Sequence, residues 1–195
     1  MVSRIVIIGA GGHGRAVAEI VLMSEQFDLV GFVDDAKSRE PVFGKPILGP
    51  IADIELLRSR TDCVFVAVGA NIVRERIHQM IRERSLSLAA AIMHPSAIVS
   101  SSARIGPGVA IMAGSLIGTE AQLGEGAIVN SGAVVDHHCV VECFGHLGTN
   151  ATMAGGSVLG RGAWMQAGAS LGYGVRVASG TVLRVGEALQ AQGSV

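Results

Sequence analysis

The sequence is poor in lysine, in cysteine and in long apolar segments. It has only two lysines and a net charge of −1 over 195 residues, so it offers no basic stripe for nucleic acid. No apolar run approaches the roughly 18 residues that a membrane-spanning helix needs, and the N-terminus is too strand-like for a secretory signal. The three cysteines, Cys63, Cys139 and Cys143, are odd in number and lack ligand-like spacing, which is typical of free thiols in a reducing compartment. These absences predict a cytoplasmic protein that binds neither nucleic acid nor membrane.

A strict six-residue repeat fills the second half of the sequence. From residue 93 to residue 182, fifteen units follow one another without an insertion, each opening with an aliphatic residue and carrying a small or compact residue four places later. A helix repeats every 3.6 residues and a strand every 2, so a period of six fits neither alone. It predicts a parallel β-helix in which each short strand places one aliphatic side chain inside. The openers are Met93, Val99, Ile105, Ile111, Ile117, Leu123, Val129, Val135, Val141, Leu147, Met153, Leu159, Met165, Leu171 and Val177.

The first ninety residues carry a different pattern. Aliphatic segments at residues 4–8, 29–33 and 64–68 each end at a glycine turn or an acidic pair, and helical spacing follows the first and the third. This pattern predicts a small Rossmann-like parallel sheet whose ligand lies at the carboxyl ends of the strands. We therefore expect an α/β domain over residues 1–92, a β-helix domain over 93–188 and a C-terminal tail over 189–195.

The turn after the first segment reads G-A-G-G-H-G at residues 9–14. Glycines let the backbone approach a ligand, and the following helix offers its N-terminal N–H groups to a phosphate. An acidic pair, Asp34 and Asp35, follows about 20 residues later, as in dinucleotide sites. A dinucleotide fold needs two such halves, however, so a half-sized site suits a nucleotide-sugar better. The alternatives are a tight turn without a ligand and two solvated carboxylates.

Three consecutive repeat units break the rule of the others. Glycine occupies the fourth place of nine of the fifteen units, where it can take the positive φ of a tight corner. His138, Phe144 and Asn150 stand there instead, within a cluster of polar and aromatic residues. Local rules fail most often where function intrudes, so this cluster is the candidate site.

One histidine of the cluster is placed for acyl transfer. If three units form one coil, residues eighteen apart stack about 4.8 Å apart, and Gly155 lies over His137. A base beside a backbone N–H is what attack on a thioester needs, and histidine can accept a proton at neutral pH. The alternative is that His137 and His138 only face solvent. A zinc site is disfavoured because Ser101 and Tyr173, two coils away, are not ligands and neighbouring side chains tend to diverge.

The motifs together resemble one family. A domain that opens with I-I-G-A-G-G-H-G, continues with V-D-D, V-G-A-N-x-x-R and H-P-S-A, and leads into hexads with D-H-H-C is similar to the sugar-modifying acetyltransferases. These include bacterial nucleotide-4-amino-sugar N-acetyltransferases and sialic-acid O-acetyltransferases, and the resemblance covers about residues 3–183. It implies a left-handed β-helix, a homotrimer with active sites between adjacent subunits, a nucleotide-sugar on the N-terminal domain and acetyl-CoA along the solenoid. No metal is expected, because the residues around His137 disfavour zinc.

The resemblance also implies residue roles. His137 would be the general base that takes a proton from the sugar amine. His146 would contact acetyl-CoA near its carbonyl, the Gly155 amide would serve the oxyanion, and Ala167 would line the coenzyme channel. Asn130 stands where the family holds a polar residue near the base. The positions that match the nucleotide-sugar site are Gly11, Gly12, His13, Asp34, Asp35 and Gly69.

Two departures from the family keep three functions open. The residue after the catalytic histidine, usually acidic and able to modulate the base, is His138, and the usual final glycine–proline–alanine segment is missing from residues 189–195. The expected activity is N-acetylation of a nucleotide-linked 4-amino sugar for surface glycan synthesis. The alternatives are O-acetylation of a sialic-acid-like sugar and a catalytically impaired, nucleotide-sugar-binding trimeric scaffold.

Overall fold

A computed structural model describes residues 2–36 and 40–191. The chain forms two compact units, Met1–Ile92 and Met93–Val195. Within the described ranges, no helix is long and apolar enough to cross a membrane.

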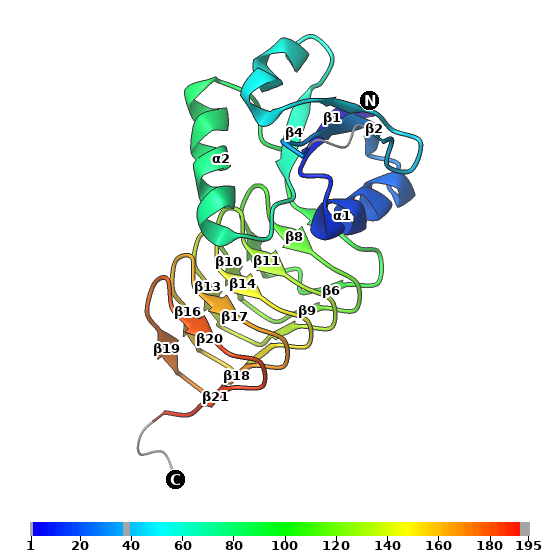
Figure 1. Ribbon diagram of the computed structural model, residues 1–195. Helices are drawn as coiled ribbons and strands as arrows, with labels where there is room; N and C mark the ends of the chain where they lie inside the picture. The colour runs from blue at the N-terminus through cyan, green and yellow to red at the C-terminus, as the bar shows by residue number, and fades with distance from the viewer. Residues whose placement is uncertain (1, 37–39, 192–195) are drawn as a thin grey trace. The chain divides into compact units, whose positions relative to one another are not determined.

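The first unit is a parallel sheet with helices between its strands (Figure 1). The strand order is β3-β2-β1-β4, and the register sets Ile8 level with both Val33 and Val66. The ends of three strands therefore meet at one edge, as the sequence predicts. The elements are β1 Ser3–Ile8, α1 Gly12–Met23, β2 Phe27–Val33, β3 Ile47–Gly49, the 3-10 helix η1 Ile51–Leu57, β4 Cys63–Val66 and α2 Asn71–Glu83.

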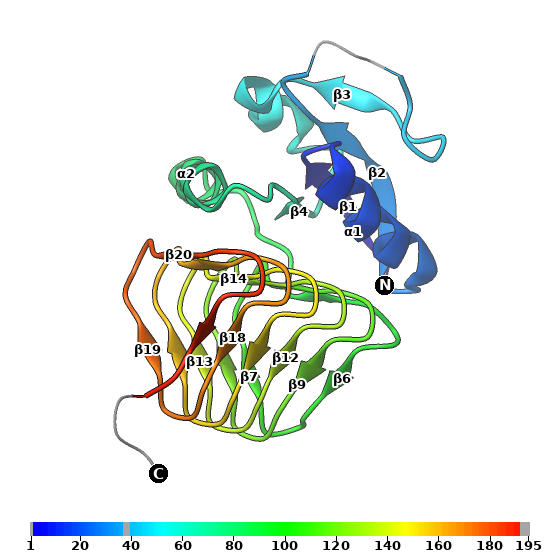
Figure 2. The same cartoon turned by 60° about the horizontal axis from the view of Figure 1, so that its bottom comes forward.

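The sheet explains the aliphatic segments. Residues 5–8 of β1 have no exposed surface because a central parallel strand is covered on both faces. The sequence missed β3, since three residues of intermediate burial carry too short a pattern. It lies at the edge beside β2, as Figure 2 shows.

The glycines of the turn after β1 serve two purposes: some allow close packing, and others leave the backbone accessible. Gly9 has φ +106°, and a Cβ there would lie 2.7 Å from the Ala67 carbonyl oxygen. A Cβ on Gly14 would collide with the carbonyl oxygen of Gly9. These two glycines let α1 pack tightly against the turn, while Gly11 and Gly12 have open space where a Cβ would stand.

The second unit is a left-handed parallel β-helix of two-residue strands (Figures 1 and 2). Its strands form three sheets, named here by their first strands: the β5 sheet, the β6 sheet and the β7 sheet. Every strand pairs with the one eighteen residues away, as Val135 does with Met153, so three hexads make one coil. The strands are β5 Ile92–Met93, β6 Ile98–Val99, β7 Arg104–Ile105, β8 Ala110–Ile111, β9 Leu116–Ile117, β10 Gln122–Leu123, β11 Ile128–Val129, β12 Val134–Val135, β13 Val140–Val141, β14 His146–Leu147, β15 Thr152–Met153, β16 Val158–Leu159, β17 Trp164–Met165, β18 Ser170–Leu171, β19 Arg176–Val177, β20 Val182–Leu183 and β21 Ala188–Leu189.

The opener of each hexad is the second residue of its strand. The openers from Ile111 to Leu183 are at most 6% exposed, and the small position holds residues such as Cys139 at 0%. The expectation is wrong for Met93, which is 48% exposed, and Val99 and Ile105 are only half-buried, because the first coil has no coil before it. The repeat continues past residue 182 through Leu183 and Leu189, because both keep the aliphatic period although Glu187 replaces a small residue between them. Strand β21 therefore includes the first residue of the expected tail, and residues 192–195 lie outside the described residues.

Candidate active site

The corner between β12 and β13 holds the two adjacent histidines. His138 has φ +57°, a left-handed conformation that is uncommon without glycine, and Phe144 and Asn150 share it at +61° and +56°. These three consecutive exceptions thus occupy backbone positions that normally need glycine. We name residues 136–139 the histidine corner.

The two imidazole rings of this corner touch. The Nδ1 atoms of His137 and His138 lie 2.9 Å apart, and the rings pack edge to face. The expectation that these neighbouring side chains diverge is wrong, because the left-handed turn at His138 swings its ring back toward His137. The Nε2 atom of His137 is left for another partner.

Gly155 lies against the His137 ring, so the expected one-coil stacking is confirmed. An ideal Cβ on Gly155 would stand 2.5 Å from His137 Nε2. The next amide, Gly156 N–H, donates to the His137 carbonyl at 3.0 Å and fixes the spacing of the two coils. Within residues 2–36 and 40–191, the Gly155 N–H has no hydrogen-bond acceptor. Proton acceptor and amide donor are therefore neighbours.

This contact predicts the effect of adding a methyl group. The variant Gly155→Ala should displace the His137 ring and lower kcat by about tenfold, because a general base must stay within hydrogen-bonding reach. The ring can rotate into solvent, so the free energy of unfolding should change by less than about 1 kcal/mol. Steady-state kinetics with urea unfolding checks both, with Gly49→Ala, whose Cβ would meet nothing, as the control. Unchanged kcat in Gly155→Ala would contradict the proposed arrangement.

Two carboxylates lie beside the two imidazole rings, one near each ring. Asp136 accepts the His137 backbone N–H at 2.7 Å, and its other oxygen is 3.7 Å from His137 Nε2. Glu120 belongs to the preceding coil, and its Oε2 is 3.1 Å from His138 Nε2. Sequence reasoning missed Glu120, although it also stands in the fourth place of a hexad, eighteen residues before His138, and has φ +57°.

The structure puts the predicted coenzyme residues on other faces of the same chain. His146 is on β14 in the β5 sheet, is 8% exposed and stacks on Trp164 of the next coil with ring centres 5.5 Å apart. Asn130 and Ala167 lie at corners that lead from the β5 sheet to the β6 sheet, and Asn130 caps the Ser131 N–H at 2.8 Å. The histidine corner leads from the β6 sheet to the β7 sheet. One chain therefore does not gather all these residues at one corner.

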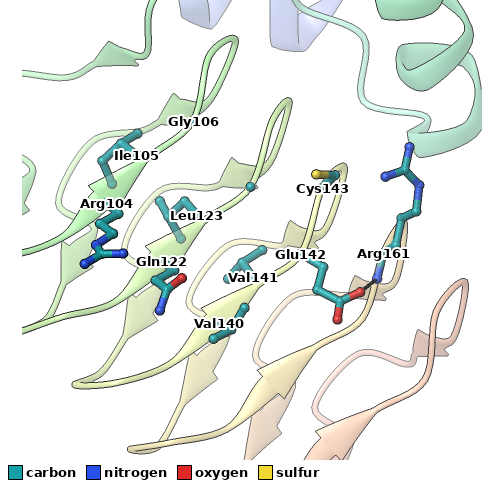
Figure 3. Close-up of a pocket in the computed structure, with 11 residues that line it drawn as sticks. Arg104, Ile105, Gly106, Gln122, Leu123, Val140, Val141, Glu142, Cys143 and Arg161 are labelled. Atoms are coloured by element: carbon teal, nitrogen blue, oxygen red, sulfur yellow. Dashed lines mark hydrogen bonds between the residues drawn. The ribbon is translucent and has the colours of Figure 1, made fainter.

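A shallow groove of about 480 Å³ crosses the β7 sheet. Figure 3 shows Arg104, Gln122 and Val140 on neighbouring strands along it, with Glu142 accepting the Arg161 backbone N–H at 2.8 Å. None of the predicted site residues lines this groove. The groove and the histidine corner thus lie at different places. We therefore locate the candidate active site by its acid–base side chains and not by the groove.

The open edge of the first unit carries the predicted nucleotide-sugar residues. Gly11, Gly12 and Gly69 are exposed, and a Cβ added to any of them would meet no atom within 4 Å. Asp34 uses both carboxylate oxygens inside the protein: it accepts the Ala10 N–H at 2.6 Å and the Ala36 N–H at 2.7 Å. It therefore holds the glycine turn in place, and Asp35 similarly accepts the Ile51 N–H at 2.8 Å.

A histidine and a buried arginine lie beneath this edge. Burial, and secondarily the charge of Arg74, lowers the pKa of His13 to about 4. Its Nε2 atom is out of solvent and has no hydrogen-bond partner among the described residues. Arg74, 0% exposed, donates to the carbonyls of Val68 and Gly69 and to the Asn71 side chain, and burial lowers its pKa to about 10. The sequence motif contained Arg74 but gave it no role.

The lowered pKa predicts a loss of stability in acid. Between pH 6.5 and about 4 the unfolded chain takes up a proton at His13 that the folded chain refuses, so the free energy of unfolding falls as pH drops through this window. The full loss should approach roughly 3 kcal/mol, at about 1.4 kcal/mol per pH unit. Urea unfolding across this range should show a shallower pH dependence in His13→Gln than in the parent. If the free energy of unfolding fell equally with pH in both proteins, His13 would not be the cause of the acid sensitivity.

No three His, Cys, Asp or Glu side chains are grouped as metal ligands in the part of the chain that the structure describes. The histidine corner instead offers a proton acceptor, and beside it on the β-helix lie carboxylates and the Gly155 amide, which has no acceptor among the described residues. This combination defines an acyltransferase of the hexapeptide-repeat type.

Comparison with known proteins narrows this class. Residues 4–81 match the family model of the PglD N-terminal domain. The UDP-N-acetylbacillosamine N-acetyltransferase of Bacillus subtilis is 36% identical over 115 residues, an alignment that spans 56% of this chain and 51% of that protein. A histidine mutant of GDP-perosamine N-acetyltransferase from Caulobacter crescentus, solved with CoA and GDP-perosamine, is 34% identical with a TM-score of 0.90, over 97% of this chain and 89% of that one. The acetyltransferase domain of PglB from Neisseria gonorrhoeae, solved with acetyl-CoA, is 30% identical with a TM-score of 0.76, over 98% and 97%.

The chain belongs to the family of nucleotide-amino-sugar N-acetyltransferases. The family expected from the sequence motifs is thereby confirmed, together with the left-handed β-helix and the α/β domain before it.

Proposed function

We propose that this protein transfers an acetyl group from acetyl-CoA to the amine of a nucleotide-linked amino sugar, with His137 as the general base. The observation that carries the proposal is that the His137 ring lies against Gly155, whose buried amide has no acceptor among residues 2–36 and 40–191. Similarity to enzymes solved with CoA and GDP-perosamine supports the substrate class.

The reaction needs one proton acceptor and one oxyanion donor. The sugar amine attacks the thioester carbonyl, so a C–N bond forms while the carbonyl oxygen becomes negative. The Gly155 N–H stabilises that oxygen, and His137 Nε2 takes the proton that the amine loses. When the C–S bond breaks, the imidazolium returns this proton to the leaving thiolate, giving CoA and the N-acetylated sugar.

The open edge of the first unit binds the nucleotide in this proposal. Helix α1 begins at Gly12 after the N-cap Gly11, and its N-terminal N–H groups suit a diphosphate. A Cβ on Gly11 or Gly12 would meet no other atom, so a ligand can approach the backbone there. Exposed Gly69 lets the ligand approach the end of β4, and His13 lies at the first turn of α1. Asp34 and Asp35 contribute chiefly by shaping the turn, since their oxygens accept backbone N–H groups.

We further propose a homotrimer in which neighbouring chains complete each active site. His146, Asn130 and Ala167, the residues proposed for acetyl-CoA, lie on a sheet and a corner away from His137 in one chain. In this arrangement, a second copy packed against the histidine corner would bring its own coenzyme residues close to His137 of the first copy. Light scattering at several protein concentrations tests the trimer, and a monomer with full activity would refute the shared site.

Free thiols and the substrate class support a cytoplasmic location in this proposal. Cys63, Cys139 and Cys143 are all free, as expected for a reducing compartment. Acetyl-CoA and nucleotide-sugars would then be available where the protein works.

Activity assays with a panel of nucleotide-sugars test the function. Purified protein, acetyl-CoA and UDP-, GDP-, dTDP- or CMP-linked amino sugars should release CoA thiol at a rate that depends on the sugar. If none of the amino sugars tested caused thiol release, although these ligands raised the thermal stability of the same protein, the proposal would be refuted. Binding without transfer is the behaviour of a scaffold. A product that mild base cleaves would indicate O-acetylation instead.

A further inference from the structure

A continuous chain of polar contacts links Glu120 to the proposed base. Glu120 Oε2 is 3.1 Å from His138 Nε2, and His138 Nδ1 is 2.9 Å from His137 Nδ1. The far nitrogen of His137, Nε2, lies against Gly155. The three side chains come from two consecutive coils and lie in one line of contacts.

We infer that Glu120, acting through His138, fixes the tautomer of His137 so that its Nε2 is free to accept a proton. This inference rests on the proposed role of His137 as the base. Glu120 and His138 are positioning residues in it, because neither lies against Gly155.

The proton positions follow from the contacts. A carboxylate can only accept a proton contact, so the Glu120 oxygen 3.1 Å from His138 Nε2 favours a proton on that nitrogen. In a neutral imidazole the other nitrogen is then an acceptor, and His138 Nδ1 must receive a proton from its partner. His137 is thus protonated on Nδ1 and has its lone pair on Nε2, the nitrogen beside Gly155. That is the tautomer a base needs.

Without Glu120 the order can reverse. His138 could then carry its proton on Nδ1 and donate it to His137, which would place the His137 proton on Nε2. That tautomer has no lone pair toward Gly155 and cannot accept a proton from the amine there. The Glu120 carboxylate is therefore required to make His137 the donor and His138 the acceptor in the contact between their Nδ1 atoms.

Backbone geometry holds the three groups in line. Glu120 and His138 both have φ +57° and occupy equivalent corners of successive coils. The His138 N–H donates to the Thr119 carbonyl at 2.8 Å, which sets the separation of these corners. Asp136 does not oppose this arrangement, because its Oδ2 is 3.7 Å from His137 Nε2, too far for a hydrogen bond that would hold a proton there. It cannot substitute for Glu120 either, because it lies beside Nε2 and not Nδ1.

Stability does not explain this arrangement. The His138 and Glu120 side chains are 60% and 62% exposed, and exposed ion pairs contribute little to folding. The readouts that distinguish a positioning role are therefore kinetic and spectroscopic.

Glu120→Gln tests the inference, with Glu55→Gln as a control that removes the same charge from an exposed site in η1. We expect kcat to fall about tenfold in Glu120→Gln, a part of the 10²- to 10⁴-fold that a general base contributes. The KM for acetyl-CoA and the urea midpoint should match those of the control. Equal kcat in the two variants would overturn the inference.

A rescue experiment and a tautomer measurement complete the test. Adding His138→Glu to Glu120→Gln puts a carboxylate beside His137 and should recover most of the lost kcat, whereas adding His138→Phe should not. The corner accepts an aromatic residue, since Phe144 occupies the equivalent left-handed position of the next corner. Recovery with both, or with neither, would count against a positioning role.

Nitrogen-15 NMR of histidine-labelled protein at pH 8, where free imidazoles are neutral, reports the tautomer directly. We expect His137 to be protonated on Nδ1 in the parent and to gain Nε2-protonated form in Glu120→Gln. An Nε2-protonated His137 in the parent would overturn the inference. This measurement also separates the two proposals: an inactive parent with the expected tautomer would refute the acetyl transfer and leave the polar chain in place.

Discussion

Replacing His137 with alanine is expected to lower kcat by about 10²- to 10⁴-fold, the contribution of a positioned general base. The ring is half exposed, so its loss should change the free energy of unfolding by less than about 1 kcal/mol. The measurement is CoA thiol release under saturating acetyl-CoA and nucleotide-sugar. Binding of acetyl-CoA, followed by calorimetry, should stay within a few-fold of the parent, since the imidazole acts on the proton of the amine.

His94→Ala provides the matched control for this variant. His94 lies near the start of the β-helix and contacts Ser96, away from the histidine corner. A His137→Ala enzyme that works within about threefold of His94→Ala would remove the general-base role, because that difference is far below the effect of a lost base.

Replacing Arg74 with alanine should have the largest effect on stability. The guanidinium is fully buried and donates to Val68 O at 2.9 Å, to Gly69 O at 3.1 Å and to the Asn71 side chain at 2.9 Å. Truncation leaves these acceptors without their donor and opens a cavity, so we expect a loss of about 3 kcal/mol or more. Urea unfolding followed by circular dichroism gives the loss, and amide hydrogen exchange of α2 should locate it in the first unit.

Arg60→Ala removes the same side chain from an exposed position and should change stability by less than about 0.5 kcal/mol. Equal unfolding midpoints for the two variants would show that the buried contacts of Arg74 contribute nothing net. Because Arg74 binds the carbonyls that follow β4, its loss should also weaken the stabilisation that a nucleotide-sugar gives to the first unit.

Periodicity made the β-helix predictable in detail. A repeat of six predicts each opener inside, and the openers from Ile111 to Leu183 follow that rule, whereas Met93 in the first coil is exposed. The sequence also located the histidine corner, because His138 stands where most hexads need glycine. The same rule would have reached Glu120, which violates it at the equivalent position one coil earlier.

Other features depend on side-chain direction, which a period does not encode. The contact of His137 with His138 arises from the left-handed turn between them, so the general tendency of neighbours to diverge misled the prediction. The acidic residue expected directly after His137 is replaced by His138. A carboxylate, that of Glu120, nevertheless contacts the His138 ring from the preceding coil. The sequence also could not predict that Asp34 accepts backbone N–H groups. An acidic residue at a strand end gives the same pattern whether it binds a ligand or the backbone.

The coil length of eighteen residues restricts how this protein can gain or lose sequence. Insertion or deletion of one whole coil keeps every aliphatic side chain inside and every corner above its equivalent, so the solenoid can lengthen or shorten in steps of that size. A change of one residue would turn the following inward side chains toward solvent. Even a whole-coil insertion is excluded between Glu120 and Gly155, because His137 and His138 draw their partners from the coils directly on either side. The candidate active site thus fixes two junctions of an otherwise extensible fold.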